Sequence, residues 1–201
     1  MVKNMKDKTK QTMNPTSEEL RAELNRAEQA SKYKITFKST VFSLITVAAV
    51  AVLIATIFLP VFQIYGSSMT PSLKDGDIVV SVKQTRIEQQ DIIAFYYNNK
   101  ILVIRVIATS GDWVDIDDDG NVYVNSVMLN EPYVQNKTIG EYDIKFPYQV
   151  PDGKIFVLGD HREVSVDSRS KSVGCVSEEQ LAGKLVLRIW PLNNVGKVNH
   201  Q

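Results

Sequence analysis

The feature that most constrains the fold is a long uncharged stretch near the N-terminus. No Asp, Glu, Lys, Arg or His occurs between Lys38 and Lys74, and residues 40–62 are predominantly apolar. These 23 residues exceed the roughly 20 that an α-helix needs to span a membrane. A buried helix of a soluble protein seldom runs so long without a polar face. A cleaved signal peptide would be shorter and would begin earlier in the chain. The sequence therefore predicts a transmembrane helix over residues 40–62.

The flanking charges predict how this helix is oriented. Lys32, Lys34 and Lys38 precede it, and cytoplasmic flanks of membrane helices are rich in Lys and Arg. We expect residues 1–39 to form a cytoplasmic tail, with disorder over residues 1–15 and a short helix after Ser17. Pro60 is expected to end or kink the membrane helix. Residues 63–201 are then an extracytoplasmic domain of a single-pass cell-membrane protein.

Charge and cysteine content exclude several classes of function. The chain has 23 basic and 23 acidic residues, so nothing predicts binding to nucleic acid. Its single cysteine, Cys175, cannot form an internal disulfide and is expected to act as a small buried apolar residue. The acidic run over residues 115–119 lacks the spacing of a calcium loop and predicts a solvated turn. We therefore predict no metal site.

The outer domain shows short segments of alternating polarity rather than helical periodicity. Turn signals occur at Asn98-Asn99 and Asp119-Gly120. This pattern predicts a mainly β fold, an antiparallel sandwich or barrel. Residues 131–153 are polar and aromatic, and their pattern predicts no element. Strands are expected at residues 77–83, 91–97, 101–108, 112–117, 121–124, 154–158 and 184–190.

Three motifs follow the predicted membrane helix. Residues 66–73 read GSSMTPSL, residues 105–112 read RVIATSGD, and residues 159–169 read GDHREVSVDSR. In this order behind a membrane anchor, they resemble the boxes of type I signal peptidases of the Gram-positive kind. The resemblance implies an external all-β domain that removes signal peptides from exported preproteins at Ala-x-Ala-type junctions. It also implies Ser-Lys chemistry without a cofactor, with signal peptides and the lipid bilayer as partners.

The resemblance also assigns roles to individual residues. Ser68 occupies the nucleophile position, and its backbone N–H would bind the oxyanion. Ser165 would lie near the dyad amine, with Asp160 supporting the site. The substrate pockets would be lined by Met69, Leu73 and Val103. The ion pairs that hold the third motif would come from Arg105, Arg162, Arg169, Asp160 and Asp167.

The sequence departs from the family at the general base. The family has a lysine immediately before the arginine of its second motif, and this chain has Ile104. A serine hydroxyl is a poor nucleophile until a base takes its proton, and isoleucine cannot accept one. Lys100 faces the same way but begins roughly 13 Å distant at about 3.3 Å per residue. The other substitutes considered are Lys74, Lys83 and His161.

These observations predict a member of the signal peptidase family whose peptidase activity is strongly impaired or absent. The alternative is a non-catalytic relative that holds extended peptides and serves as a binding or surface-assembly factor. A self-cleaving repressor, which also uses a Ser-Lys dyad, is disfavoured by the membrane segment and by the lack of a basic DNA-reading helix.

Overall fold

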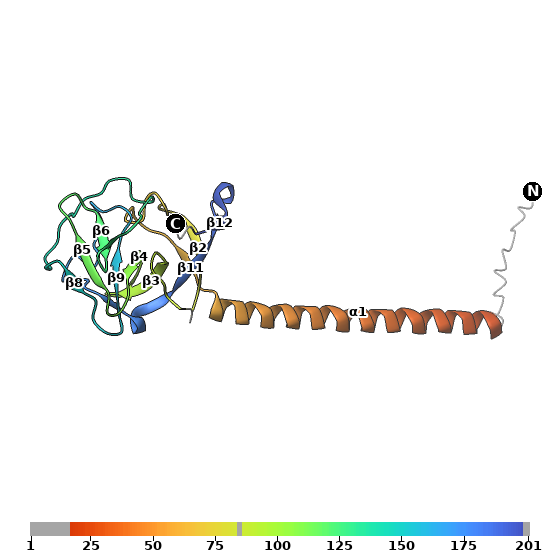
Figure 1. Ribbon diagram of the computed structural model, residues 1–201. Coiled ribbons are helices and arrows are strands. Elements are labelled where there is room, and N and C mark those ends of the chain that lie inside the picture. The colour runs from red at the N-terminus through yellow and green to blue at the C-terminus, as the bar shows by residue number, and fades with distance from the viewer. Residues whose placement is uncertain (1–16, 84–85, 199–201) are drawn as a thin grey trace, which may run out of the picture. The chain divides into compact units, whose positions relative to one another are not determined.

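The computed structural model describes residues 17–83 and 86–198, and Figure 1 shows its long helix and its β-domain. Helix α1 (Ser17–Phe58) is continuous, so the helix expected in the tail and the apolar segment are one element. Its section Lys32–Phe58 contains an 18-residue window with a mean hydropathy of 2.7 and is long and apolar enough to cross a membrane. The expected disorder of residues 1–15 lies outside the described residues.

Helix α1 ends at Phe58 rather than at residue 62. Leu59 still donates its N–H to the carbonyl of Ala55, but Pro60 has no N–H to continue the helix. The chain then enters strand β1 (Val61–Gln63). The proline thus ends the helix, as predicted.

The β-domain consists of two antiparallel sheets, which confirms the predicted fold class. The larger sheet has the main order β1, β2 (Ile78–Val82), β11 (Leu181–Trp190), β3 (Ile92–Tyr97), β4 (Lys100–Ala108), β9 (Lys154–Leu158) and β10 (Val176–Ser177). It also contains β12 (Gly196–Lys197), which pairs with β11, and short 3-10 helices η1 (Glu178–Gln180) and η2 (Leu192–Asn194) flank β11. The smaller sheet has the order β7 (Val127–Met128), β6 (Val122–Val124), β5 (Trp113–Ile116) and β8 (Tyr148–Gln149).

A tight hairpin fixes the register of β3 against β4. Tyr97 pairs with Lys100, and the two residues between them have positive φ angles of 45° for Asn98 and 61° for Asn99. Asparagine tolerates this left-handed conformation, which two-residue hairpins require. The turn predicted at Asn98-Asn99 is therefore confirmed, and it places Ile104 opposite Ile93.

Three apolar clusters form the core of the β-domain. The first joins the two sheets around Ile107, Val114 and Phe156. The second packs the segment between β1 and β2 onto the larger sheet, and the third lies around β3, β4 and β9 and includes Ile104. The second and third clusters meet strand β4 on its two sides, since Val103 packs against one and Ile104 belongs to the other.

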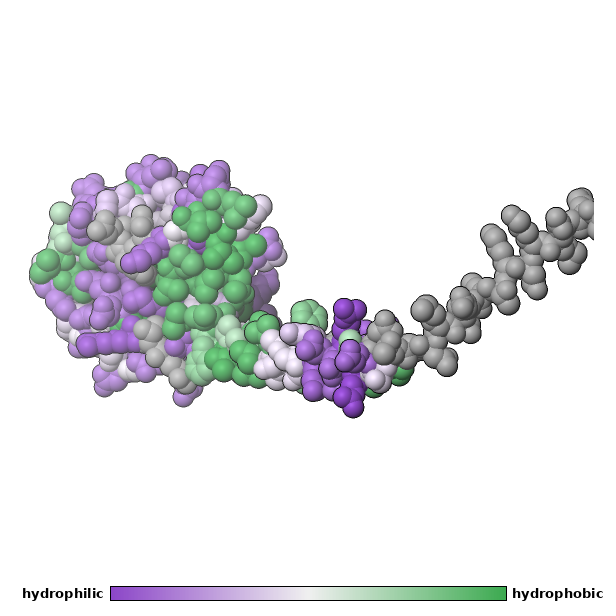
Figure 2. All heavy atoms as spheres, turned by 90° about the vertical axis from the view of Figure 1, so that its right-hand side faces the viewer, coloured by the Kyte–Doolittle hydropathy of each residue, from purple (hydrophilic) through white to green (hydrophobic). Residues whose placement is uncertain are grey.

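The β-domain also carries apolar side chains on its outside. Figure 2 shows a broad apolar area on one of its faces. Surfaces of this kind commonly contact other proteins or lipid. Large apolar side chains that are exposed in the domain include Val61, Tyr65, Tyr96, Val164, Val166, Trp190, Leu192 and Val195.

Candidate active site

The loop that carries Ser68 is held by both backbone and core contacts. Gly66 has a φ of +89° and donates its N–H to Asp75 Oδ1 at 2.8 Å. The next turn is anchored by Met69 and Leu73, which are each 1% exposed and pack in the second cluster. Ser68 itself is half-buried. The loop therefore presents the serine from a fixed backbone.

The third motif lies directly against this loop. His161 donates its backbone N–H to the Ser68 carbonyl oxygen at 2.9 Å, and Ser165 donates its own to the His161 carbonyl at 3.1 Å. A Cβ on Gly159 would lie 2.7 Å from the Ser68 carbonyl oxygen and would collide with the Ser165 side chain. Only glycine therefore fits at position 159, and it allows the two motifs to approach this closely.

Ser68 and Ile104 line the same cleft, which has a volume of about 290 Å³. The structure thus brings together the predicted nucleophile position, the position of the missing lysine, and Ser165. No residue among the described lining has an ionisable side chain. The cleft is lined by Gly66, Ser67, Ser68, Leu102, Val103, Ile104, Val164, Ser165 and Val166.

The surroundings of Ile104 are apolar. Its side chain is 3% exposed and packs in the third cluster, which also contains Phe95 and Val157. In contrast, the Ser165 hydroxyl in the same cleft is buried and has no hydrogen-bond partner among the described residues. A buried hydroxyl without a partner costs about 1–3 kcal/mol. The cleft thus contains a buried hydroxyl without a described partner, and the isoleucine in the same cleft cannot form a hydrogen bond with it.

The substitute bases considered from the sequence do not line the cleft. Lys100 lies at the hairpin end of β4, and Lys74 is exposed. Lys83 lines a different hollow of the domain. The backbone of His161 binds the serine loop, but its Nδ1 is buried without a described partner and its side chain is not part of the cleft wall.

The residues predicted to contact substrate occupy two environments. Val103 lines the cleft beside Ile104. Met69 and Leu73 are buried in the core below the loop and are not among the lining residues. A substrate contact by these two side chains stays a prediction, and their observed contacts are those of core residues that fix the loop.

The arginine of the second motif forms a buried ion pair with the third motif. Arg105 Nε and Nη2 donate to the two carboxylate oxygens of Asp160 at 2.8 and 2.7 Å. The Arg105 guanidinium also lies 3.7 Å from the ring centre of Tyr133. Burial, reinforced by the charge of Glu131, raises the pKa of the Tyr133 hydroxyl far above its ordinary value. These contacts tie strand β4 to the segment that faces Ser68.

Two further arginines of the third motif form buried ion pairs, one within the motif and one with Glu131. Arg169 Nε donates to Asp167 Oδ1 at 2.8 Å, and Arg162 forms a buried ion pair with Glu131. The Arg105, Arg162 and Arg169 side chains are at most 2% exposed. Arginine pairs of this kind match the ion-pair role predicted from the sequence. Glu131 and Tyr133 were not predicted, because they lie in the segment 131–153 whose pattern indicated no element.

Comparison with known proteins identifies the family. The model of the family described as signal peptidase, peptidase S26, matches residues 37–190. Signal peptidase IB from Staphylococcus aureus (strain COL) is 36% identical over 152 residues, covering 66% of this chain and 78% of that protein. Signal peptidase I from Bacillus licheniformis is 29% identical over 188 residues, covering 86% and 98%. The crystal structure of a signal peptidase I from Enterococcus faecalis V583 aligns with a TM-score of 0.43 at 31% identity, covering 50% of this chain and 97% of that one.

Fold and site together define an antiparallel β-domain that follows an apolar helix and carries a serine in an apolar cleft. The family match covers far more than half of the chain. The chain belongs to the type I signal peptidase family.

Proposed function

We propose that this protein binds the cleavage regions of exported preproteins in the Ser68 cleft and hydrolyses them at a strongly reduced rate. The observation that carries the proposal is the lining of the cleft, which contains a serine hydroxyl and Ile104 but no ionisable side chain among the described residues. The apolar walls suit small side chains of an extended peptide. The relatives that carry the name signal peptidase point to the substrate class.

In the proposed reaction, Ser68 Oγ attacks the scissile carbonyl of the bound peptide. The Ser68 backbone N–H would stabilise the oxyanion that forms. The hydroxyl proton must leave as the bond forms, and Ile104 offers no site to receive it, so it passes to solvent water. The departing amine takes a proton from water, and a second water then hydrolyses the ester formed on Ser68. Serine-based sites that lose one member of their catalytic set keep only about 10³–10⁴-fold catalysis over water, which comes from binding and the oxyanion hole.

The unpartnered hydroxyl of Ser165 supports this reading of the cleft. A lysine at position 104 would line the same cleft as Ser68 and Ser165, and the Ser165 hydroxyl could accept a hydrogen bond from its amine. With isoleucine present, the buried hydroxyl lacks that donor. The cleft thus retains a supporting group for a base that the chain no longer carries.

A second function is favoured by the packing of Ile104. The Ile104 side chain packs among apolar residues of the third cluster, so its surroundings suit an isoleucine. This arrangement suits a non-catalytic relative that holds extended peptides as a binding or surface-assembly factor. The two functions share the peptide site and differ in whether any turnover depends on Ser68.

The orientation of the domain is part of the proposal. Lys32, Lys34 and Lys38 lie at the start of the apolar section of α1, so the positive-inside rule places residues 1–39 in the cytoplasm. The cleft-bearing domain then lies outside the membrane, where exported preproteins emerge. The helix supports attachment to the bilayer by its length and composition.

A photoreactive peptide that ends in an Ala-x-Ala junction tests both binding and orientation. In detergent we expect it to label the cleft, and Val166→Asp, on an exposed wall residue, should reduce labelling about tenfold by placing a charge in an apolar groove. An exposed control, Glu163→Gln, should label like the wild type.

On intact protoplasts, labelling from outside is expected. Labelling in detergent that ignores Val166→Asp would contradict the site, and labelling only after lysis would contradict the orientation.

A further inference from the structure

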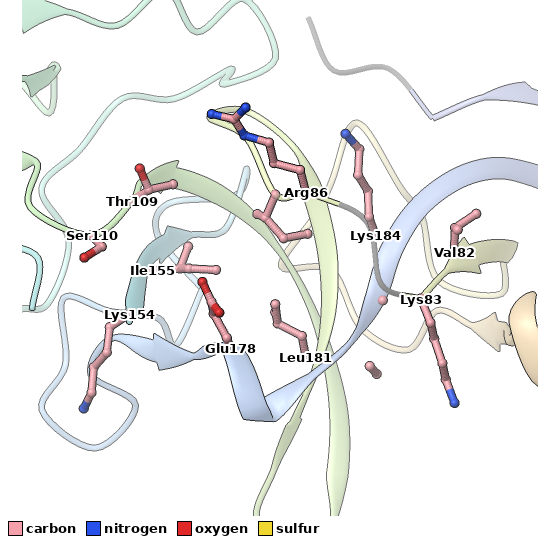
Figure 3. A pocket seen from close by; sticks show the side chains of 13 residues that line it. Val82, Lys83, Arg86, Thr109, Ser110, Lys154, Ile155, Glu178, Leu181 and Lys184 are labelled. Atoms are coloured by element: carbon pink, nitrogen blue, oxygen red, sulfur yellow. The ribbon is translucent and has the colours of Figure 1, made fainter. Parts of the chain in front are cut away.

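A second hollow of the β-domain is larger than the Ser68 cleft and shares no lining residue with it. Its volume is about 600 Å³, and it lies where the ends of β2 and β4 meet the starts of β9 and β11 (Figure 3). Ile155 and Leu181 contribute apolar surface between these elements. The proposed peptide-binding function makes no use of it.

The charges around this hollow are mostly positive. Its lining includes Lys83, Arg86, Lys154 and Lys184, with Glu178 as the acidic residue. Lys184 is paired with Asp91 at 2.7 Å, whereas the other three cations form no ion pair with a described residue. The hollow therefore presents at least three uncompensated cations against one carboxylate, on a chain whose net charge is zero. Such a concentration of one sign attracts anions.

The placement of the cations indicates the shape of the anion. Figure 3 shows the charged ends of Arg86, Lys154 and Lys83 at separate points around the hollow rather than at one centre. A single phosphate concentrates its charge at one centre and does not match cations placed at separate points. An anion with regularly spaced charges along a chain could contact several, and its uncharged linkers would rest on Ile155 and Leu181.

We propose that this hollow binds an extended phosphodiester anion. Lysine and arginine are the side chains that most often bind phosphate groups. The Ser110 hydroxyl at the rim already donates to Asp152 Oδ1 at 3.3 Å, so the proposed contacts come from the cations alone. A soluble phosphodiester polymer and a membrane of phosphodiester lipids share this chemistry, and the geometry of separated cations favours the polymer.

Binding of poly(glycerol phosphate) of about ten units to the full chain in neutral detergent tests the proposal. We expect saturable binding that weakens as the salt concentration rises. With three phosphates contacted and about −0.7 per phosphate, the logarithm of the association constant should fall with the logarithm of the salt concentration at a slope near −2. The variant Lys83→Gln, Arg86→Gln, Lys154→Gln should bind at least tenfold more weakly. Glu178→Gln should bind severalfold more tightly, because it removes the acidic group.

A matched control separates a specific site from general attraction. The variant Lys137→Gln, Lys145→Gln, Lys197→Gln removes the same charge from exposed positions outside the hollow and should bind like the wild type. Equal losses in the two triple variants would overturn the proposal, provided both melt like the wild type. So would equal affinity for inorganic phosphate, or binding to phosphatidylglycerol vesicles without binding to the soluble polymer. The variants of this hollow should still be labelled normally by the Ala-x-Ala peptide. A failure of polymer binding can therefore be distinguished from a failure of the proposed function.

Discussion

An Ile104→Lys variant is expected to cleave signal-peptide substrates about 10³-fold faster than the wild-type chain. The new amine would lie in the cleft with Ser68 and Ser165, and a positioned general base typically contributes about 10²–10⁴-fold. Its apolar surroundings would disfavour the ammonium form and so keep it able to accept a proton. The measurement is kcat/KM on a preprotein substrate in detergent.

Two controls make this prediction specific to the amine. Ile104→Met introduces an unbranched side chain, like that of lysine but without a base, and should show no gain. Adding Ser68→Ala to Ile104→Lys should remove the gain entirely. We expect the lysine to cost about 1–3 kcal/mol of stability at this nearly buried position, so melting must show that the variant is folded. A folded Ile104→Lys variant with wild-type activity would show that the site lacks more than its base.

Removing the carboxylate of Asp160 is expected to destabilise the β-domain by about 3–5 kcal/mol. Asp160→Ala would leave the Arg105 guanidinium buried without its bidentate partner, and the pair is at most 1% exposed. The loss is large because the remaining charge cannot reach water. Urea unfolding of the full chain in detergent, followed by tryptophan fluorescence, measures it.

A neighbouring acidic residue provides the matched control. Glu163 belongs to the same motif but is exposed, so Glu163→Ala should change stability by no more than about 0.5 kcal/mol. Asp160→Asn keeps one acceptor for Arg105 and should fall between the two. A loss below about 1 kcal/mol for Asp160→Ala would contradict the view that this ion pair holds the third motif beside Ser68.

Local patterns were sufficient to predict much of this architecture. The strands from β2 to β6, with β9 and β11, were visible as alternating apolar runs bounded by turn residues. The two-residue strands β7, β8, β10 and β12 were not predicted, because so short a pairing has no periodicity of its own. Helix α1 ends at Phe58 rather than at the expected residue 62, because Pro60 lacks an N–H for the helix and its ring clashes with the preceding turn.

The features of the site that the sequence did not predict have a different physical cause. Resemblance placed Ser68, Ile104 and Ser165 in one site, and the structure brings them into one cleft. Pairing between distant residues could not be read from the sequence. Glu131 lies 31 positions from Arg162, and no local pattern links them. The burial of Met69 and Leu73 likewise depends on the larger sheet beneath the loop, which their own motif does not reveal.

In the function we propose, Ser68 lies in a signal-peptidase cleft without a base. The decisive measurement compares cleavage of one preprotein by the wild-type chain and by Ser68→Ala, with Ile104→Lys as the positive control. We predict that the wild type cleaves slowly, faster than Ser68→Ala but by no more than about tenfold, while both still bind the substrate. Rapid cleavage by the wild type that Ser68→Ala abolishes would contradict this account, because it would require a base that the cleft as described does not contain.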